Sequence, residues 1–379
     1  MKALDLGAWV SAVTLAAVWL LYPLVMGALA GMTRRRVRPA GPRAGSAGRS
    51  VSIVIATRDD AAAVYARIED CLKATNALPR LEVVVALDPR RVPDALEGLP
   101  APRKAVRFVP GDEPGGKAAT LNAGVRAASG DIIVFTDTSQ RFHPDAIRAL
   151  VEVFSQPGVG AASGSLELPP SSGITSLAAL YWRLERWLRH REAEVCSSVG
   201  VTGAIYAIRK ALWKPLPPGL LLDDLYTPMQ IVLQGYRVGF VDGARAWETR
   251  RPGPSEEYRR KTRTLTGVIQ LCAWLPALLN PGRNPLWAPF VFHKLLRFLT
   301  PYCALVITAW CLVVTWPMVT GHWDTWLGPA AAGLLGVLVL RADRARQLRH
   351  VIAQAVLLQA AVVVATYNGL RGRWDVWGK

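Results

Sequence analysis

The chain has 379 residues, 51% of them hydrophobic, and 45 Lys and Arg against 28 Asp and Glu give a formal net charge of +17. Most of the basic excess lies beside apolar segments, at 34–38 and 341–349. A nucleic-acid-binding protein would instead spread basic residues over a soluble domain and interleave them with aromatic residues, so we expect no nucleic-acid partner. The five cysteines have no CxxC spacing, which argues against a disulfide framework or a zinc site. Reduced thiols are consistent with a catalytic part that lies in the cytoplasm.

The N-terminal segment predicts a transmembrane helix within residues 1–33. Residues 6–33 carry no charged side chain, and roughly 20 apolar residues suffice to cross a bilayer. A cleaved signal peptide is the alternative, because Ala28-Leu29-Ala30 resembles a cleavage site, but the apolar run is long for one. Three arginines follow at 34–36, and the positive-inside rule then places the downstream chain in the cytoplasm. We therefore expect a multi-pass protein of the inner (cytoplasmic) membrane, in contact with membrane lipids.

Residues 34–50 form a basic linker, and an α/β domain is predicted over 51–264. Short β-branched runs at 51–56, 81–86, 105–109 and 131–136 alternate with helical stretches. Continuous apolar strands of this kind predict a buried, mostly parallel sheet with crossover helices. Ligands bind beyond the carboxyl ends of such strands. Polar residues collect at those ends, among them Thr57, Asp88 and Asp137.

The chain becomes apolar again after residue 264. Residues 265–298 predict interfacial helices, because Gln270 and Pro276 interrupt the first apolar run. Residues 299–370 predict a transmembrane region with spans at 299–320, 326–340 and 351–370. Three spans would place the tail, 371–379, outside despite its basic residues. Either the last segment is re-entrant or interfacial, or the rule fails there.

Two loops have the chemistry to bind a nucleotide diphosphate and its metal ion. Asp137 and Ser139 follow a buried strand, where a carboxylate suits a hard cation such as Mg²⁺ or Mn²⁺. The alternative is a turn or helix cap. Lys117 follows two glycines at the start of a helical stretch and has the length to reach a phosphate. Here the alternative is an ordinary loop.

An acidic pair and a basic run complete the candidate chemistry. Asp223 and Asp224 open a helical stretch, where acidic residues also interact favourably with the helix dipole. The catalytic alternative is that their mutual repulsion raises one pKa and leaves a poised base. The basic run at 259–263 is either a membrane-surface patch or places Arg263 on a leaving diphosphate.

Together these motifs, in this order, resemble the family 2 glycosyltransferases over roughly residues 50–300. Within them the chain is similar to the membrane-integrated branch of cellulose, chitin and hyaluronan synthases. The resemblance implies a GT-A-like fold, a UDP-sugar donor, and Mg²⁺ or Mn²⁺ as cofactor. It also implies that Asp88 binds the nucleotide, with Thr57 beside it, and that Lys117 lies near the donor.

The resemblance further assigns roles around the reacting atoms. Asp137 matches the first acid of the family's DxD motif, and Ser139 replaces the second. Gly203 matches a loop that lines the acceptor, and Asp224 matches the general base, supported by Asp223. Residues 260–264 stand in place of the QxxRW motif: Arg263 is retained, while Arg260 replaces Gln and Thr264 replaces Trp. The lost Trp weakens the case for processive polymerisation.

The expected function is inverting transfer of a sugar to a hydroxyl of a polysaccharide or lipid-linked glycan at the membrane. This reaction would belong to cell-envelope or exopolysaccharide synthesis, in which envelope-synthesis proteins are the expected partners. The alternative is a non-catalytic, nucleotide-binding scaffold of such a synthesis complex, because Ser139 replaces an acid and the QxxRW motif is altered. Processive and single-sugar addition both remain open.

Overall fold

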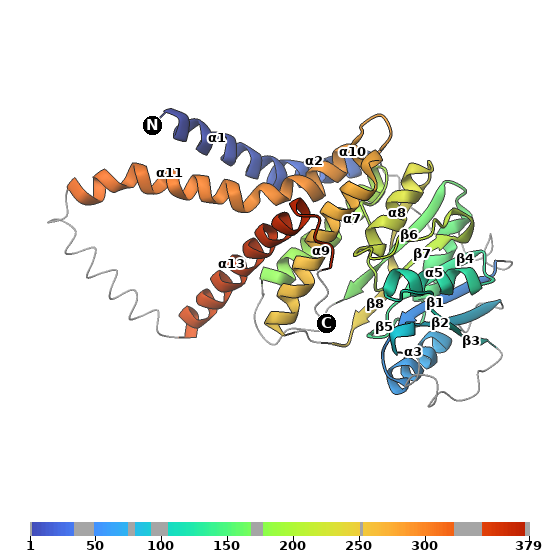
Figure 1. Ribbon diagram of the computed structural model, residues 1–379. Coiled ribbons are helices and arrows are strands. Elements are labelled where there is room, and N and C mark those ends of the chain that lie inside the picture. The colour runs from blue at the N-terminus through green and yellow to red at the C-terminus, as the bar shows by residue number, and fades with distance from the viewer. Residues whose placement is uncertain are drawn as a thin grey trace.

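The computed structural model describes residues 2–33, 49–74, 80–91, 105–167, 177–250, 253–321 and 343–375. Most of the predicted basic linker and the whole apolar segment predicted at 326–340 lie outside these residues. The elements that are described form one α/β domain and a group of long helices beside it (Figure 1).

The domain is built on an eight-stranded mixed sheet with the order β3-β2-β1-β4-β7-β6-β8-β5. The four predicted strands are confirmed, and they pair in parallel as predicted. They are β1 (Val51–Thr57), β2 (Leu81–Leu87), β3 (Val106–Pro110) and β4 (Ile132–Thr136).

The other half of the sheet was not predicted and contains all its antiparallel pairs. β7 pairs antiparallel with both β4 and β6, and β5 pairs antiparallel with β8, whereas β6 and β8 are parallel. These strands are β5 (Gln140–Phe142), β6 (Val159–Glu167), β7 (Tyr206–Arg209) and β8 (Arg237–Glu248).

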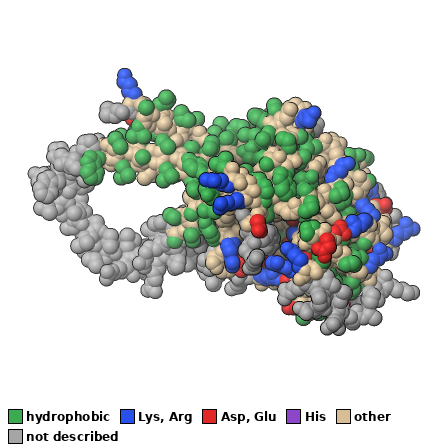
Figure 2. All heavy atoms as spheres, viewed as in Figure 1, with side chains coloured by type: hydrophobic (Ala, Val, Ile, Leu, Met, Phe, Trp, Pro, Cys, Tyr) green, Lys and Arg blue, Asp and Glu red, His purple; other side chains and the backbone are tan. Residues whose placement is uncertain are grey.

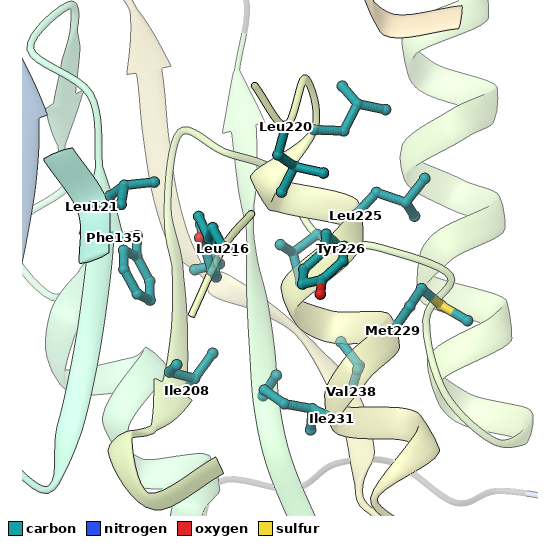
Figure 3. Packing of buried hydrophobic residues seen from close by; sticks show 14 of the residues in the cluster. Leu121, Phe135, Ile208, Leu216, Leu220, Leu225, Tyr226, Met229, Ile231 and Val238 are labelled. Carbon is teal, nitrogen blue, oxygen red and sulfur yellow. The ribbon is translucent and has the colours of Figure 1, made fainter. Parts of the chain in front are cut away.

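Helices cover both faces of the sheet, so the domain has three layers and two cores. Alternate residues of one strand point to opposite faces: Ile53 and Ile55 join the core under α3 (Ala61–Lys73) and α6 (Ala146–Glu152). Val54 joins the other core, under α5 (Lys117–Ala127) and α8 (Asp223–Leu233). Figure 3 shows this second core, with Phe135 of the sheet among side chains from the helices.

Helix α9 (Pro254–Trp274) passes through the predicted border at 264–265. Beyond it, Val268 and Leu271 are buried in the second core. Gln270 is fully buried, accepts a hydrogen bond from Leu221 N (2.9 Å) and donates one to Gly219 O (3.0 Å). The second half of α9 therefore packs as part of the α/β domain, and α13 (Asp343–Leu370) packs along the same helix.

Two described helical stretches are long and apolar enough to cross a membrane, namely Lys2–Thr33 and Trp287–Trp316. The first comprises α1 (Lys2–Ala16), a π-helical turn and α2 (Tyr22–Thr33), and the second leads into α11 (Thr300–Gly321). α1 and α11 lie side by side, and hydrophobic side chains cover their visible surface (Figures 1 and 2). The apolar part of α13 is shorter, Val356–Leu370.

A buried polar network fastens these helices to α7 (Leu177–Val195). The Tyr22 hydroxyl donates to Glu192 Oε1 (2.6 Å), and His293 Nδ1 lies 2.6 Å from the same oxygen. His293 Nε2 contacts Glu185 Oε2 at 2.9 Å. The long helices are therefore joined to α7 through buried hydrogen bonds.

Candidate active site

Lys117 joins two of the predicted acidic residues at the carboxyl edge of the sheet. Its Nζ lies 3.2 Å from Asp137 Oδ1 and 3.3 Å from Asp223 Oδ1. The two glycines before it, Gly115 and Gly116, have φ values of 83° and 92°, which residues with a side chain rarely adopt. Burial would lower the pKa of Lys117, but the nearby carboxylates raise it above its usual value, so the ammonium stays charged.

Asp223 and Asp224 form the start of α8, and a neighbouring loop lies against them. Val201 N donates to the backbone oxygen of Asp224 (3.0 Å), and a Cβ placed on Gly203 would lie 3.4 Å from Asp224 Oδ2. Burial and repulsion from Asp223 raise the pKa of Asp224, while Lys117 and Arg189 partly oppose the rise. A carboxylate with a raised pKa suits proton abstraction.

Asp88 lies at the end of β2 and is held by Arg90 and the glycine loop. Arg90 Nη2 donates to Asp88 Oδ2 (2.6 Å), and a Cβ on Gly115 would clash with Asp88 Oδ1 at 2.7 Å. Burial would raise the pKa of Asp88, but the hydrogen bonds from Arg90 and Gly116 lower it. Thr57 O accepts from Asp88 N (2.9 Å), so these two predicted residues adjoin each other.

Ser139 has a carboxylate beside it that sequence reasoning missed. Its hydroxyl donates to Glu248 Oε2 (3.3 Å), and Gln140 Nε2 contacts the same oxygen at 2.7 Å. Within the described ranges, no three His, Cys, Asp or Glu side chains gather closely enough to hold a metal ion by themselves. Mg²⁺ is commonly held by one or two carboxylates plus substrate phosphates, and Asp137, two residues before Ser139, offers one such carboxylate.

The two predicted arginines of α9 lie in different surroundings. The charge of Arg263 acts on Asp224, which places it near the acid pair. The guanidinium carbon of Arg260 instead lies 5.7 Å from the ring centroid of Trp182 on α7. Only Arg263 is thus brought toward Lys117, Asp223 and Asp224.

Arg67 of α3 is a further residue near the site, and nothing in the sequence marked it as one. This fully buried side chain forms an ion pair with Asp70, and its Nη2 donates to Thr136 Oγ1 (2.6 Å). The Thr136 hydroxyl in turn donates to Ala204 O (2.8 Å). Arg67 therefore connects the strand before Asp137 to the loop that contains Gly203.

A comparison with solved structures shows a protein of similar fold. Among solved structures, a mannosyltransferase from Pyrobaculum calidifontis, in complex with GDP-Man and Mn²⁺, superposes with a TM-score of 0.65 at 20% identity, covering 97% of this chain and 99% of that one. A glucosyl-3-phosphoglycerate synthase from Mycobacterium tuberculosis, in complex with Mn²⁺, UDP-Glc and phosphoglyceric acid, gives 0.40 at 17% identity, covering 60% of this chain and 80% of that one. No curated protein matches the chain.

The family comparison covers the α/β domain. The family model described as glycosyltransferase-like family 2 matches residues 48–267, from just before β1 to the middle of α9. The matched stretch includes the glycine loop, Asp137 and the acid pair. Because the match extends over more than half of the 379 residues, the chain belongs to the glycosyltransferase-like family 2.

Proposed function

We propose that the protein is an inverting glycosyltransferase of the membrane-integrated branch, which transfers a sugar from a UDP-sugar to a hydroxyl of a polysaccharide or lipid-linked glycan. The observation that carries this proposal is the convergence of Lys117, Asp137 and Asp223, with Asp224 beside them. A cation between carboxylates at the carboxyl edge of a sheet suits a nucleotide diphosphate.

On the donor side, Asp88 and Thr57 bind the nucleoside, and Lys117 and Arg263 face the diphosphate. Asp137 would hold a divalent cation, and Ser139, whose hydroxyl donates to Glu248, follows it by two residues. The cation supplies positive charge that neutralises the diphosphate. The mannosyltransferase solved with GDP-Man and Mn²⁺ supports a nucleotide-sugar donor and such a cation in this fold.

On the acceptor side, Asp224 acts as the general base. Its carboxylate takes the proton of the acceptor hydroxyl as that oxygen attacks the anomeric carbon of the donor sugar. The bond from that carbon to the diphosphate oxygen breaks, and UDP leaves with the electron pair on the face opposite the attack. The single displacement inverts the anomeric configuration. Lys117 and Arg263 stabilise the charge on the departing diphosphate.

We place the reaction at the cytoplasmic face of the inner membrane. The apolar helices Lys2–Thr33 and Trp287–Trp316 have the length to span it, and exposed large side chains such as Leu6, Leu24 and Leu305 suit a lipid environment. Nucleotide sugars are found in the cytoplasm.

Nucleotide release from the detergent-purified full chain, measured across a panel of UDP- and GDP-sugars, tests the proposal. We expect turnover of one UDP-sugar with Mg²⁺ or Mn²⁺ and its loss in EDTA, because the Asp137 carboxylate repels the diphosphate unless a divalent cation lies between them. Turnover that persists in EDTA would contradict the metal assignment. Donor binding without turnover, even with lipid-linked acceptors present, would favour the non-catalytic scaffold.

The pH dependence of kcat tests the acid pair. A base is active only when deprotonated, so activity is lost as pH falls through its pKa. Because the pKa of Asp224 is raised, we expect that loss to begin above the ordinary aspartate value of about 3.9. Asp223→Asn removes the repulsion and should shift the acid limb to lower pH, whereas Asp145→Asn, a change of an exposed aspartate directly before α6, should leave it in place. An unshifted limb in Asp223→Asn would contradict the coupling.

A further inference from the structure

A second cluster of charged side chains lies between α7, α9 and the turn that leads into α11. At its centre is Glu185 of α7, whose Oε1 lies 2.6 Å from Lys294 Nζ and 3.5 Å from Arg189 Nε. Glu185 Oε2 lies 2.9 Å from Arg297 Nη1. Burial would raise the pKa of Glu185, but His293, Lys294 and Arg189 hold it well below its usual value. We call Arg189, Lys261, Lys294 and Arg297 the basic cluster.

The basic cluster has more positive charge and more N–H donors than Glu185 satisfies. Lys261 Nζ lies 3.8 Å from Glu257 Oε1 and 4.8 Å from the Tyr181 ring centroid. Burial lowers the pKa of Lys261, and repulsion from Arg260 and Lys294 acts in the same direction. The Arg297 side chain is 10% exposed, yet its Nε and Nη2 have no hydrogen-bond acceptor in the part of the chain that the structure describes. Buried donors without acceptors are costly, so this arrangement favours an added anion.

The basic cluster adjoins the two apolar helical stretches. The guanidinium carbon of Arg297 lies 4.7 Å from the Trp19 ring centroid, and Trp19 Nε1 donates to Thr300 Oγ1 (3.1 Å). Both stretches carry exposed large hydrophobic side chains near these residues in sequence: Leu20, Leu21, Leu24, Leu299, Tyr302 and Leu305. A cationic cluster beside exposed apolar side chains fits a ligand with an anionic head and a hydrocarbon tail, and not a free anion.

The basic cluster is also connected to the proposed base. Arg189 forms an ion pair with Glu185, and its charge acts on Asp224. Arg189 is thus the member of the basic cluster whose charge acts both on Glu185 and on the proposed base.

We infer that the basic cluster binds the phosphate of a lipid-linked acceptor, whose hydrocarbon chain lies along α2 and α11. This inference rests on the proposed function for the identity of the ligand as acceptor, because the anion site itself requires no donor. Of the two acceptor classes in the proposed function, the basic cluster favours the lipid-linked glycan over a free polysaccharide.

The test is a binding titration of the full chain in detergent with farnesyl phosphate, followed by tryptophan fluorescence because Trp19 contacts Arg297. Farnesol and inorganic phosphate are the two comparison ligands. Lys261→Met and Arg297→Lys are the variants, and Arg259→Met, an exposed change on the same helix, is the matched control. Circular dichroism on each variant verifies that it is folded, and Lys261→Met, whose side chain is 18% exposed, is the milder change.

We expect farnesyl phosphate to bind at least tenfold more tightly than farnesol, and Lys261→Met to weaken that binding about tenfold while Arg259→Met does not. Equal binding of farnesol and farnesyl phosphate would overturn the phosphate site. If inorganic phosphate at the same concentration displaced all of the bound farnesyl phosphate, the claim that the ligand is a lipid would be overturned. Unchanged affinity in both folded variants would overturn the location. The titration contains no nucleotide sugar, so a protein that binds farnesyl phosphate but uses no donor would contradict only the proposed function.

Discussion

Asp224→Asn is expected to lower kcat by about 10²–10⁴, the usual contribution of a positioned general base. The change keeps the size of the side chain and the contact with the Gly203 loop but removes the proton acceptor. Donor affinity should change little, because Lys117 still bridges Asp137 and Asp223. Nucleotide release and a separate donor-binding titration, on the same preparation, distinguish the two effects.

The matched control for this substitution is Asp145→Asn, which removes an exposed carboxylate that pairs with Arg148. It should retain the activity of the unchanged protein. Full transferase activity in the Asp224→Asn protein would contradict the assignment of Asp224 as the general base. Equal loss of activity and donor binding would instead make Asp224 part of the donor site.

Arg67→Met is expected to lower the free energy of unfolding by about 3–5 kcal/mol, as breaking a buried ion pair does. The fully buried guanidinium contacts Asp70, Thr136 and the ring of Phe142, whose centroid lies 3.8 Å away. Methionine fills part of the volume but leaves Asp70 without its ion-pair partner, so that, in the described part of the chain, only the hydrogen bond from Phe142 N (3.1 Å) remains to its carboxylate. For a chain of 379 residues the entropy of unfolding is about 0.8 kcal/mol/K, so we expect Tm to fall by about 4–6 °C, which thermal melting in detergent measures.

Arg126→Met is the control for Arg67→Met. Arg126 also pairs with an aspartate, Asp112 at 2.5 Å, but its side chain is 67% exposed. Exposed ion pairs contribute little to stability, so its Tm should not change measurably. Equal Tm values for the two variants would show that the buried pair does not hold the strand end and the loop together.

The parallel half of the sheet was predictable because its strands are continuous apolar runs buried on both faces. VSIVIA of β1 and LEVVVA of β2 leave no helical alternative of that length. The other half was not predictable by the same rule. β6 is VGAASGSLE, in which small and polar residues replace the β-branched ones, and β5 has only three residues. Their places in the sheet depend on neighbours distant in the sequence.

In the site, the sequence indicated the residues that lie directly after strands or at helix starts. Lys117, Asp137 and Asp223 had such positions, and the structure brings them together. Glu248 and Arg67 had none: their partners Ser139 and Thr136 are 109 and 69 residues away. An arginine in an amphipathic helix resembles a surface residue until the fold buries it. The roles of the named residues in catalysis stay predictions.

The continuity of α9 limits how the protein can be divided or recombined. Gln270 fixes the loop 219–221 that precedes the acid pair, while the same helix carries Arg263 and packs against α13. The family match ends at residue 267, inside this helix, where the packing shows no domain boundary. The two halves of the molecule are therefore not interchangeable modules. A chimera that joins this sugar-transfer domain to another protein's membrane helices has to keep α9 whole, together with the surface of α13 that it meets.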